Sequence, residues 1–247
     1  MEAFLDVTIL PQPDDTTCGP TCLHAVYQYY GDDIPLARVI DEVKSLETGG
    51  TLDVFLACHA LRRGYKARIY TYNLQVFDPT WFPHDPDYIE ARLLAQMGAK
   101  DDAKLHLATR GYLNFLNLGG ELRFADLTPA LLRKYLKRSI PVLTGLSSTY
   151  LYRSMREYGY LCEDDDVRGN PSGHFVLLCG YNRPDRLVAI ADPHMGNPLA
   201  VGQKYEVSID RVICSILLGI VTYDANLLII EPSKKKNNGR ANHTVLA

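Results

Sequence analysis

The sequence predicts an α+β fold, in which N-terminal helices pack on a mostly antiparallel sheet formed mainly by the C-terminal third of the chain. Two observations support this prediction. Between residues 18 and 63, apolar residues recur at helical spacing. From residue 174 onward, they form short apolar runs and alternating segments that are separated by turn residues. Helices therefore come first, and the principal strands follow.

Composition limits the classes of protein that are compatible with the chain. It has 247 residues, of which 47% are hydrophobic and 22% are charged, so it can bury a full core without disulfides. Cys58, Cys179 and Cys214 lie inside apolar runs, as reduced core cysteines do. The net charge of −3 gives no reason to expect nucleic acid as a partner. Neither a signal peptide nor a membrane-spanning run is visible, so we expect a cytoplasmic protein with no membrane contact, and we predict no oligomeric state.

The elements expected before residue 128 are mostly helical. A short strand at Val7–Leu10 leads into the first helix, which Thr16 or Thr17 can cap and Gly31 ends. Residues 73–86 contain three prolines and little periodicity, so we expect a surface excursion there. The further expected elements are helices at Pro35–Leu46, Thr51–Arg63, Asp87–Met97 and Ala103–Leu118, and strands at Lys66–Tyr72 and Glu121–Phe124.

The remaining elements are mostly strands. Thr128 should cap a helix at Pro129–Arg138. His174–Tyr181 and Leu187–Ala191 should form a hairpin, because Asn, Pro and Asp lie in the turn between them. The other expected elements are strands at Pro141–Leu146, Tyr205–Val207, Gly219–Tyr223 and Leu227–Ile230, and a helix at Ile209–Leu217. We expect a single domain over residues 1–232, followed by a disordered basic tail at 233–247.

Cys18 lies where a turn-rich segment passes into the first helix, and Pro20 is tolerated in the first turn of a helix. The backbone N–H groups and dipole at a helix N-terminus favour a thiolate over a thiol, so Cys18 is a candidate nucleophile. The alternative is a small buried cysteine. Cys22 lies one turn further on the same face, but no second Cys/His pair with finger-like spacing follows. We therefore predict no metal site.

His174 and Asp192 supply the groups that a nucleophilic cysteine needs. His174 begins one hairpin strand and Asp192 follows the other, so antiparallel pairing should make them neighbours. An imidazole accepts the proton of the thiol, and a carboxylate orients the imidazole. Gln12, on the loop before Cys18, can donate a hydrogen bond to an oxyanion beside the Cys18 N–H. Taken alone, His174 would be a structural histidine and Asp192 a turn residue; the combination predicts catalysis.

The sequence segments that contain these four residues resemble those of the cysteine peptidases that process the double-glycine leader peptides of bacteriocins. They also resemble stand-alone relatives with a papain-like fold. The resemblance rests on Gln12…Cys18-Gly-Pro-Thr-Cys-Leu, Ser172-Gly-His174-Phe-Val and Ile190-Ala-Asp192-Pro193, and it covers roughly residues 5–72 and 130–230. It implies a papain-like fold and no metal or organic cofactor. It further implies that Cys18 is the nucleophile, His174 the general base and then acid, Asp192 the orienting carboxylate and Gln12 the oxyanion donor.

Two segments depart from the compact leader peptidases. Residues 73–127 and 147–173 lengthen the interval between Cys18 and His174, and no transporter domain follows, so the resemblance implies the chemistry rather than the double-glycine specificity. The second segment is rich in tyrosine and ends at the candidate histidine. We predict that it forms one wall of the substrate site, with Tyr158, Tyr160 and Gly173 as substrate-binding residues.

The expected activity is cleavage of a peptide or small amide through a thioester acyl-enzyme on Cys18. Two alternatives remain: a transferase that passes the acyl group to an amine or thiol, and a catalytically silent domain that only binds peptides. The acidic run Glu163–Asp166 would suit a substrate with basic groups or a free amine, and it could equally be a solvated loop. The sequence identifies no substrate.

Overall fold

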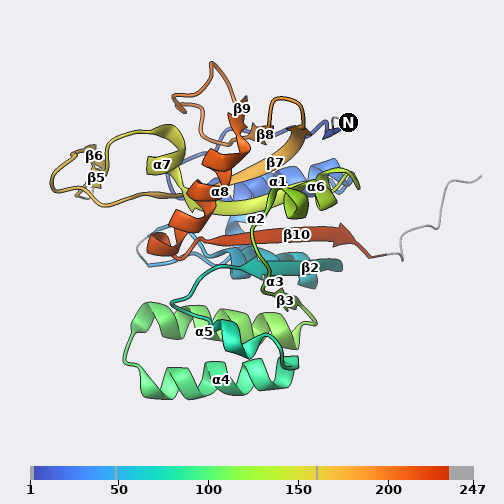
Figure 1. Cartoon of the computed structure of the whole chain (residues 1–247), viewed down its shortest axis with the longest axis vertical. Coiled ribbons are helices and arrows are strands. Elements are labelled where there is room, and N and C mark those ends of the chain that lie inside the picture. The colour runs from blue at the N-terminus through green and yellow to red at the C-terminus, as the bar shows by residue number, and fades with distance from the viewer. Residues whose placement is uncertain (1–2, 48, 160, 234–247) are drawn as a thin grey trace, which may run out of the picture.

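The computed structural model describes residues 3–47, 49–159 and 161–233. Its centre is a sheet with the strand order β3-β2-β10-β4-β7-β8-β9, and β1 pairs with β7 (Figure 1). Only the pairing of β2 with β3 is parallel among these described strands. The strands are β1 (Ala3–Phe4), β2 (Tyr65–Thr71), β3 (Glu121–Arg123), β4 (Val142–Ser147), β7 (Gly173–Asn182), β8 (Leu187–Ala191), β9 (Lys204–Ser208) and β10 (Asn226–Pro232). The predicted α+β layout with a mostly antiparallel sheet is confirmed.

Helices cover both faces of this sheet. The helices are α1 (Cys18–Tyr29), α2 (Leu36–Glu42), α3 (Asp53–Arg62), α4 (Pro86–Ala99), α5 (Ala103–Asn117), α6 (Pro129–Leu136), α7 (Ser148–Tyr152) and α8 (Ile209–Leu218). Side chains of β7 alternate between two hydrophobic clusters. Phe175 and Leu177 join the cluster that contains α1, α3 and α5, whereas Val176 and Leu178 join the cluster that contains α6 and α8. Because both faces are buried there, β7 is apolar from Phe175 to Gly180.

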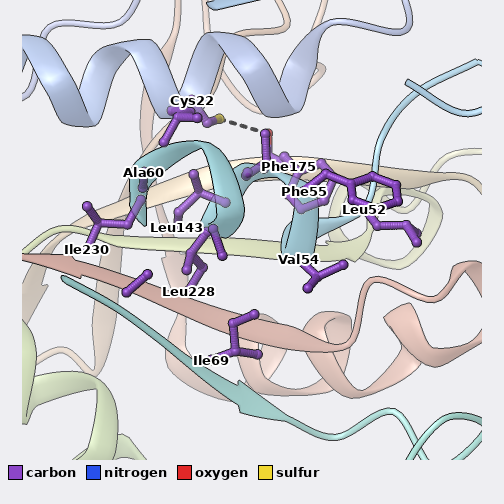
Figure 2. Close-up of a cluster of buried hydrophobic side chains, with 14 of the residues drawn as sticks. Cys22, Leu52, Val54, Phe55, Ala60, Ile69, Leu143, Phe175, Leu228 and Ile230 are labelled. Carbon is purple, nitrogen blue, oxygen red and sulfur yellow. Dashed lines mark hydrogen bonds between the residues drawn. The ribbon is translucent and has the colours of Figure 1, made fainter. Parts of the chain in front are cut away.

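The first cluster fixes the start of α1 against β7 (Figure 2). The Cys22 thiol donates a hydrogen bond to the backbone oxygen of Phe175 at 3.3 Å. Gly19 lies so close to the loop before α3 that a Cβ atom there would be 2.7 Å from Cγ2 of Thr51. Interiors packed at this density leave little room for movement. Cys18, the neighbour of Gly19, is therefore held in a fixed position relative to β7.

Residues 73–127 form a 3₁₀ turn (Pro79–Trp81), the α4–α5 hairpin and β3. The hairpin lies at the bottom of Figure 1, and Gly111 of α5 packs against Val54 and Phe55 of α3. The prediction of a surface excursion at 73–86 is wrong in part, because Val76 and Phe77 are buried. Phe77 packs edge to face on Tyr112, with ring centroids 4.6 Å apart.

Three local predictions fail for identifiable reasons. No strand forms at Val7–Leu10, since the pairing with β7 is made by the earlier residues of β1. Gly219–Thr222 is a 3₁₀ turn rather than a strand, and it ends at Tyr223, whose φ of 74° is left-handed. Thr17 precedes α1 but makes no side-chain cap, because its hydroxyl donates to the Asp14 carbonyl oxygen at 3.1 Å.

The C-terminal half follows the predictions more closely. The Thr128 hydroxyl accepts from the Leu131 N–H at 3.2 Å, as predicted for the cap of α6. Residues 147–173 contain α7 and a small hairpin of β5 (Glu157–Tyr158) and β6 (Glu163–Asp164), which projects at the left of Figure 1. Within the described parts of the chain, none of the helices has the length and apolar character needed to cross a bilayer. The predicted tail lies outside the described residues from position 234 onward.

Candidate active site

The hairpin of β7 and β8 brings His174 and Asp192 together, as its two strand ends predict. Nε2 of His174 donates to Oδ1 of Asp192 at 2.8 Å. Asp192 is fully buried and His174 is 8% exposed. The carboxylate therefore fixes the orientation of the imidazole and leaves Nδ1 as the ring nitrogen available to a third group.

Four hydrogen bonds hold the Asp192 carboxylate. Oδ2 accepts from the hydroxyls of Tyr152, at 2.7 Å, and Tyr205, at 2.6 Å. Oδ1 accepts from His174 and from the backbone N–H of His194, at 2.9 Å. Burial alone would raise the pKa of Asp192, but the hydrogen bonds from His174 and the two tyrosines, with the charge of His174, hold this pKa below its usual range. Asp192 is consequently an ionised carboxylate in a water-poor site.

His174 also contacts the side chain of Cys18, at the first position of α1. Burial disfavours the charged imidazolium, but the negative charge of Cys18 and the hydrogen bonds to Asp192 and Cys18 outweigh it, and they raise the pKa of His174 to about 10. The imidazole thus keeps its proton at neutral pH. A thiolate beside an imidazolium is the reactive state of a nucleophilic cysteine.

Gln12 lies at the same cleft, but its amide contacts its own loop. Nε2 donates to the Asp14 carbonyl oxygen at 2.9 Å, and Oε1 is buried without a hydrogen-bond partner. The Gln12 backbone N–H donates to the Pro193 carbonyl oxygen at 2.9 Å, which ties this loop to the segment after Asp192. A carboxamide has two N–H groups. The hydrogen bond to Asp14 uses one of them.

The cleft beside His174 has a volume of about 330 Å³. Its lining comes largely from residues 147–173 and from the loop before α1. The lining residues are Gln12, Asp15, Ser148, Tyr152, Glu157, Leu161, Cys162, Ser172, Gly173, His174 and His194. Gly173 therefore borders the cleft. Tyr158 is not among these lining residues, and its ring lies under the Arg168 guanidinium, with the Arg168 Cζ atom 4.2 Å from the ring centroid. Tyr160 lies outside the described residues.

Sequence reasoning missed Tyr152, Tyr205 and His194. Tyr205 falls in a predicted strand, but nothing in the sequence pairs its hydroxyl with Asp192. Tyr152 lies in an aperiodic segment 40 positions from Asp192, so no local pattern connects the two. His194 follows Asp192 by two positions, and this proximity was an available signal; its ring centroid is 6.2 Å from that of His174.

No family model matches the sequence, and no curated protein matches it. Solved structures do match. A Bacillus anthracis protein described as a C39-like peptidase is 14% identical, with a TM-score of 0.52 over 95% of this chain and 100% of that one. A double-glycine-motif protease from an AMS/PCAT transporter is 14% identical, with a TM-score of 0.48 over 94% of this chain and 95% of that one. The peptidase domain of Streptococcus ComA, a bifunctional ABC transporter, is 14% identical, with a TM-score of 0.45 over 92% of this chain and 99% of that one. The fold is that of the papain-like C39 peptidases.

Proposed function

We propose that this chain is a cysteine peptidase or amidase that cleaves a peptide or amide bond through a thioester on Cys18. The observation that carries the proposal is the placement of a buried imidazole between a cysteine at a helix start and a buried, ionised carboxylate. A domain that only binds peptides gains nothing from burying these charged groups, because each one costs free energy to remove from water. A nucleophile, by contrast, requires them.

The proposed mechanism assigns one role to each group. The Cys18 thiolate attacks the carbonyl carbon, and the Cys18 N–H and the Gln12 amide donate hydrogen bonds to the oxyanion. Nδ1–H of His174 then protonates the leaving amine, and the C–N bond breaks to leave the thioester. Neutral His174 next takes a proton from water, whose oxygen attacks the thioester and releases the acid and the thiolate. Asp192 accepts from Nε2–H throughout and stays ionised.

A peptide-library experiment tests this proposal. The protein is incubated with the library, quenched in acid, and analysed by intact mass for an acyl adduct and by peptide mass for products. Parallel reactions contain added amine, so that transfer to the amine is distinguished from hydrolysis. Cys18→Ala should lose both adduct and products. Cys214→Ala, which removes an exposed cysteine of α8, is the matched control.

The outcomes separate the three activities considered. Hydrolysed products that require Cys18 support the peptidase assignment. Products that carry the added amine in preference to water would instead assign a transferase. Equal turnover by Cys18→Ala, or the absence of both turnover and adduct across the library, would overturn the proposal.

A further inference from the structure

A second group of buried polar side chains lies between the sheet and helices α3 and α5, outside the catalytic triad. Asp53, the first residue of α3, is 1% exposed, and Asp224, just before β10, is 7% exposed. Oδ1 of Asp53 accepts a long hydrogen bond of 3.4 Å from the Tyr112 hydroxyl. Oδ2 of Asp53 is buried and has no hydrogen-bond partner. A buried carboxyl oxygen left without a donor is costly, and it calls for an explanation.

Asn226 adds two further unpartnered atoms to this group. Its side chain is fully buried, and neither its amide nitrogen nor its amide oxygen has a hydrogen-bond partner. Its backbone N–H donates to the Asp224 carbonyl oxygen at 2.8 Å. Burial and the negative charge of Asp53 raise the pKa of the Tyr112 hydroxyl, and the nearby Asn226 side chain lowers it. Two unpartnered acceptors, Oδ2 of Asp53 and Oδ1 of Asn226, and one unpartnered donor, Nδ2 of Asn226, therefore belong to this group.

This group lies next to the reacting residues. Thr51, two positions before Asp53, packs against Gly19, the neighbour of Cys18. On the other side, a Cβ atom on Gly173, the neighbour of His174, would collide with Oδ2 of Asp224. Gly173 is exposed and lines the catalytic cleft, so the absence of a side chain there lets the carboxylate approach the cleft edge.

We propose that Asp53, Asp224, Asn226 and Tyr112 form a substrate subsite for a cationic group, a primary ammonium or a guanidinium, located beside the scissile bond. This inference rests on the proposed function. An ammonium group offers three donors, and the unpartnered Asp53 and Asn226 oxygens are acceptors. Charge-assisted hydrogen bonds of this kind are among the strongest that proteins make. An ammonium of the chain itself, on Lys104, already lies at this edge, 3.4 Å from the Thr222 carbonyl oxygen.

The protonation of the two carboxyls supports the assignment. Burial raises the pKa of both Asp53 and Asp224 to about 7, and for Asp53 the negative charge of Asp224 adds to this effect. Tyr112 faces Asp53, whereas Lys104, His174 and the Thr222 hydroxyl act on Asp224 and favour its charged form. The two carboxyls thus hold protons near neutral pH, and a bound cation would replace them. Preference for a cationic substrate should accordingly increase as the pH rises through about 7.

Matched covalent reagents test the subsite without knowledge of the natural substrate. Chloromethyl ketones of acetyl-lysine and acetyl-norleucine differ by the terminal ammonium group, and both alkylate cysteine. A second pair, acetyl-lysyl-glycine and acetyl-norleucyl-glycine, places the ammonium one residue further away. The measured quantity is the ratio of Cys18 alkylation rates within a pair, so any general change in Cys18 reactivity cancels.

We expect a lysine-to-norleucine ratio of about ten or more for at least one pair at pH 8, since one charged interaction changes rates on this scale. The ratio should fall at pH 6. Asp53→Asn and Asp224→Asn, which are isosteric, should each reduce it to within about twofold of unity. Asp101→Asn, which removes an exposed carboxylate elsewhere, should keep it.

Two results would overturn the subsite: a ratio near unity for both pairs in the unmodified protein, or an unchanged ratio in both carboxamide variants. If one variant fails to fold, the other decides. Iodoacetamide labelling separates this inference from the proposed function. Selective labelling of Cys18 without a charge preference removes the subsite alone, whereas unselective labelling removes the peptidase assignment as well.

Discussion

The two tyrosine hydroxyls on Asp192 provide a quantitative test of the site. We predict that Tyr152→Phe and Tyr205→Phe each destabilise the protein by about 1.5–3 kcal/mol at pH 7, the range for hydrogen bonds to charged groups. The structure favours this range because the two distances to Oδ2 are 2.7 and 2.6 Å and Asp192 is fully buried. Phenylalanine keeps the ring, so the loss of packing is small. The double variant leaves Oδ2 with no donor, and its cost should be about 3–6 kcal/mol if the two effects add.

The pH dependence of this cost has a definite sign. The pKa of Asp192 is held below its usual value, so the stability it contributes is present above the unfolded pKa and is lost as the pH falls through the folded pKa. Each tyrosine contributes to that lowering. The cost of Tyr205→Phe should therefore be full at pH 7, and it should shrink below about pH 4, the usual value for aspartate, once the carboxyl is protonated.

Urea unfolding at pH 7 and at pH 3.5 measures both quantities. Tyr70→Phe is the matched control, because it removes a buried hydrogen bond of 2.7 Å to a hydroxyl, that of Tyr135, rather than to a carboxylate. Its cost should be about 0.5–1.5 kcal/mol and should change little between the two pH values. If Tyr152→Phe and Tyr205→Phe destabilise the protein no more than this control, or by the same amount at both pH values, then the two hydroxyls do not stabilise an ionised Asp192.

Three further predictions concern the same region. In a peptide-cleavage assay, His174→Ala should lower the turnover rate about 10²–10⁴-fold. Asp192→Asn should fold and should lower the turnover rate by less, and the reverse order would contradict the assigned roles. Gly173→Ala should lower the free energy of unfolding, measured with urea, by about 1–3 kcal/mol, because the added Cβ atom collides with the buried Asp224 carboxyl. Gly98→Ala is the control and should not destabilise the protein, because a Cβ atom there meets nothing within 4 Å. The raised pKa of Asp53, about 7, means that the folded state binds the extra proton between about pH 4 and 7, so this carboxyl lowers stability as the pH rises through that window. Asp53→Asn should remove that decline, and an unchanged stability profile would count against the raised pKa.

The predictable parts of the site are those that depend on local sequence. The turn between two apolar strands places His174 beside Asp192, and the turn-to-helix transition places Cys18 at the start of α1. Both follow from the backbone alone. The position of Tyr152 does not, because α7 spans only Ser148–Tyr152 and lies in a segment without periodicity. Its contact with Asp192 depends on how the whole chain packs.

The fold shows the same division. Strong apolar runs predicted the central strands, but the weak edge strand was misplaced, because pairing with β7 rather than propensity selects Ala3–Phe4. The burial of Phe77 was also hidden, because the prolines around it are typical of surface loops. Its burial comes from contact with Tyr112 of the α4–α5 hairpin, 35 positions along the chain, which local patterns do not report.

Alkylation of the six cysteines by iodoacetamide, followed by mass spectrometry across a range of pH, measures whether His174 activates Cys18. Near neutral pH, Cys18 should react much faster than the exposed Cys162, whose pKa is raised by burial and by the charge of Glu157. In His174→Ala, the rate of Cys18 at pH 6 should fall at least about tenfold while that of Cys162 stays the same. Equal labelling of Cys18 and Cys162 in the unmodified protein, with Cys18 accessible to the reagent, would show that His174 does not activate Cys18.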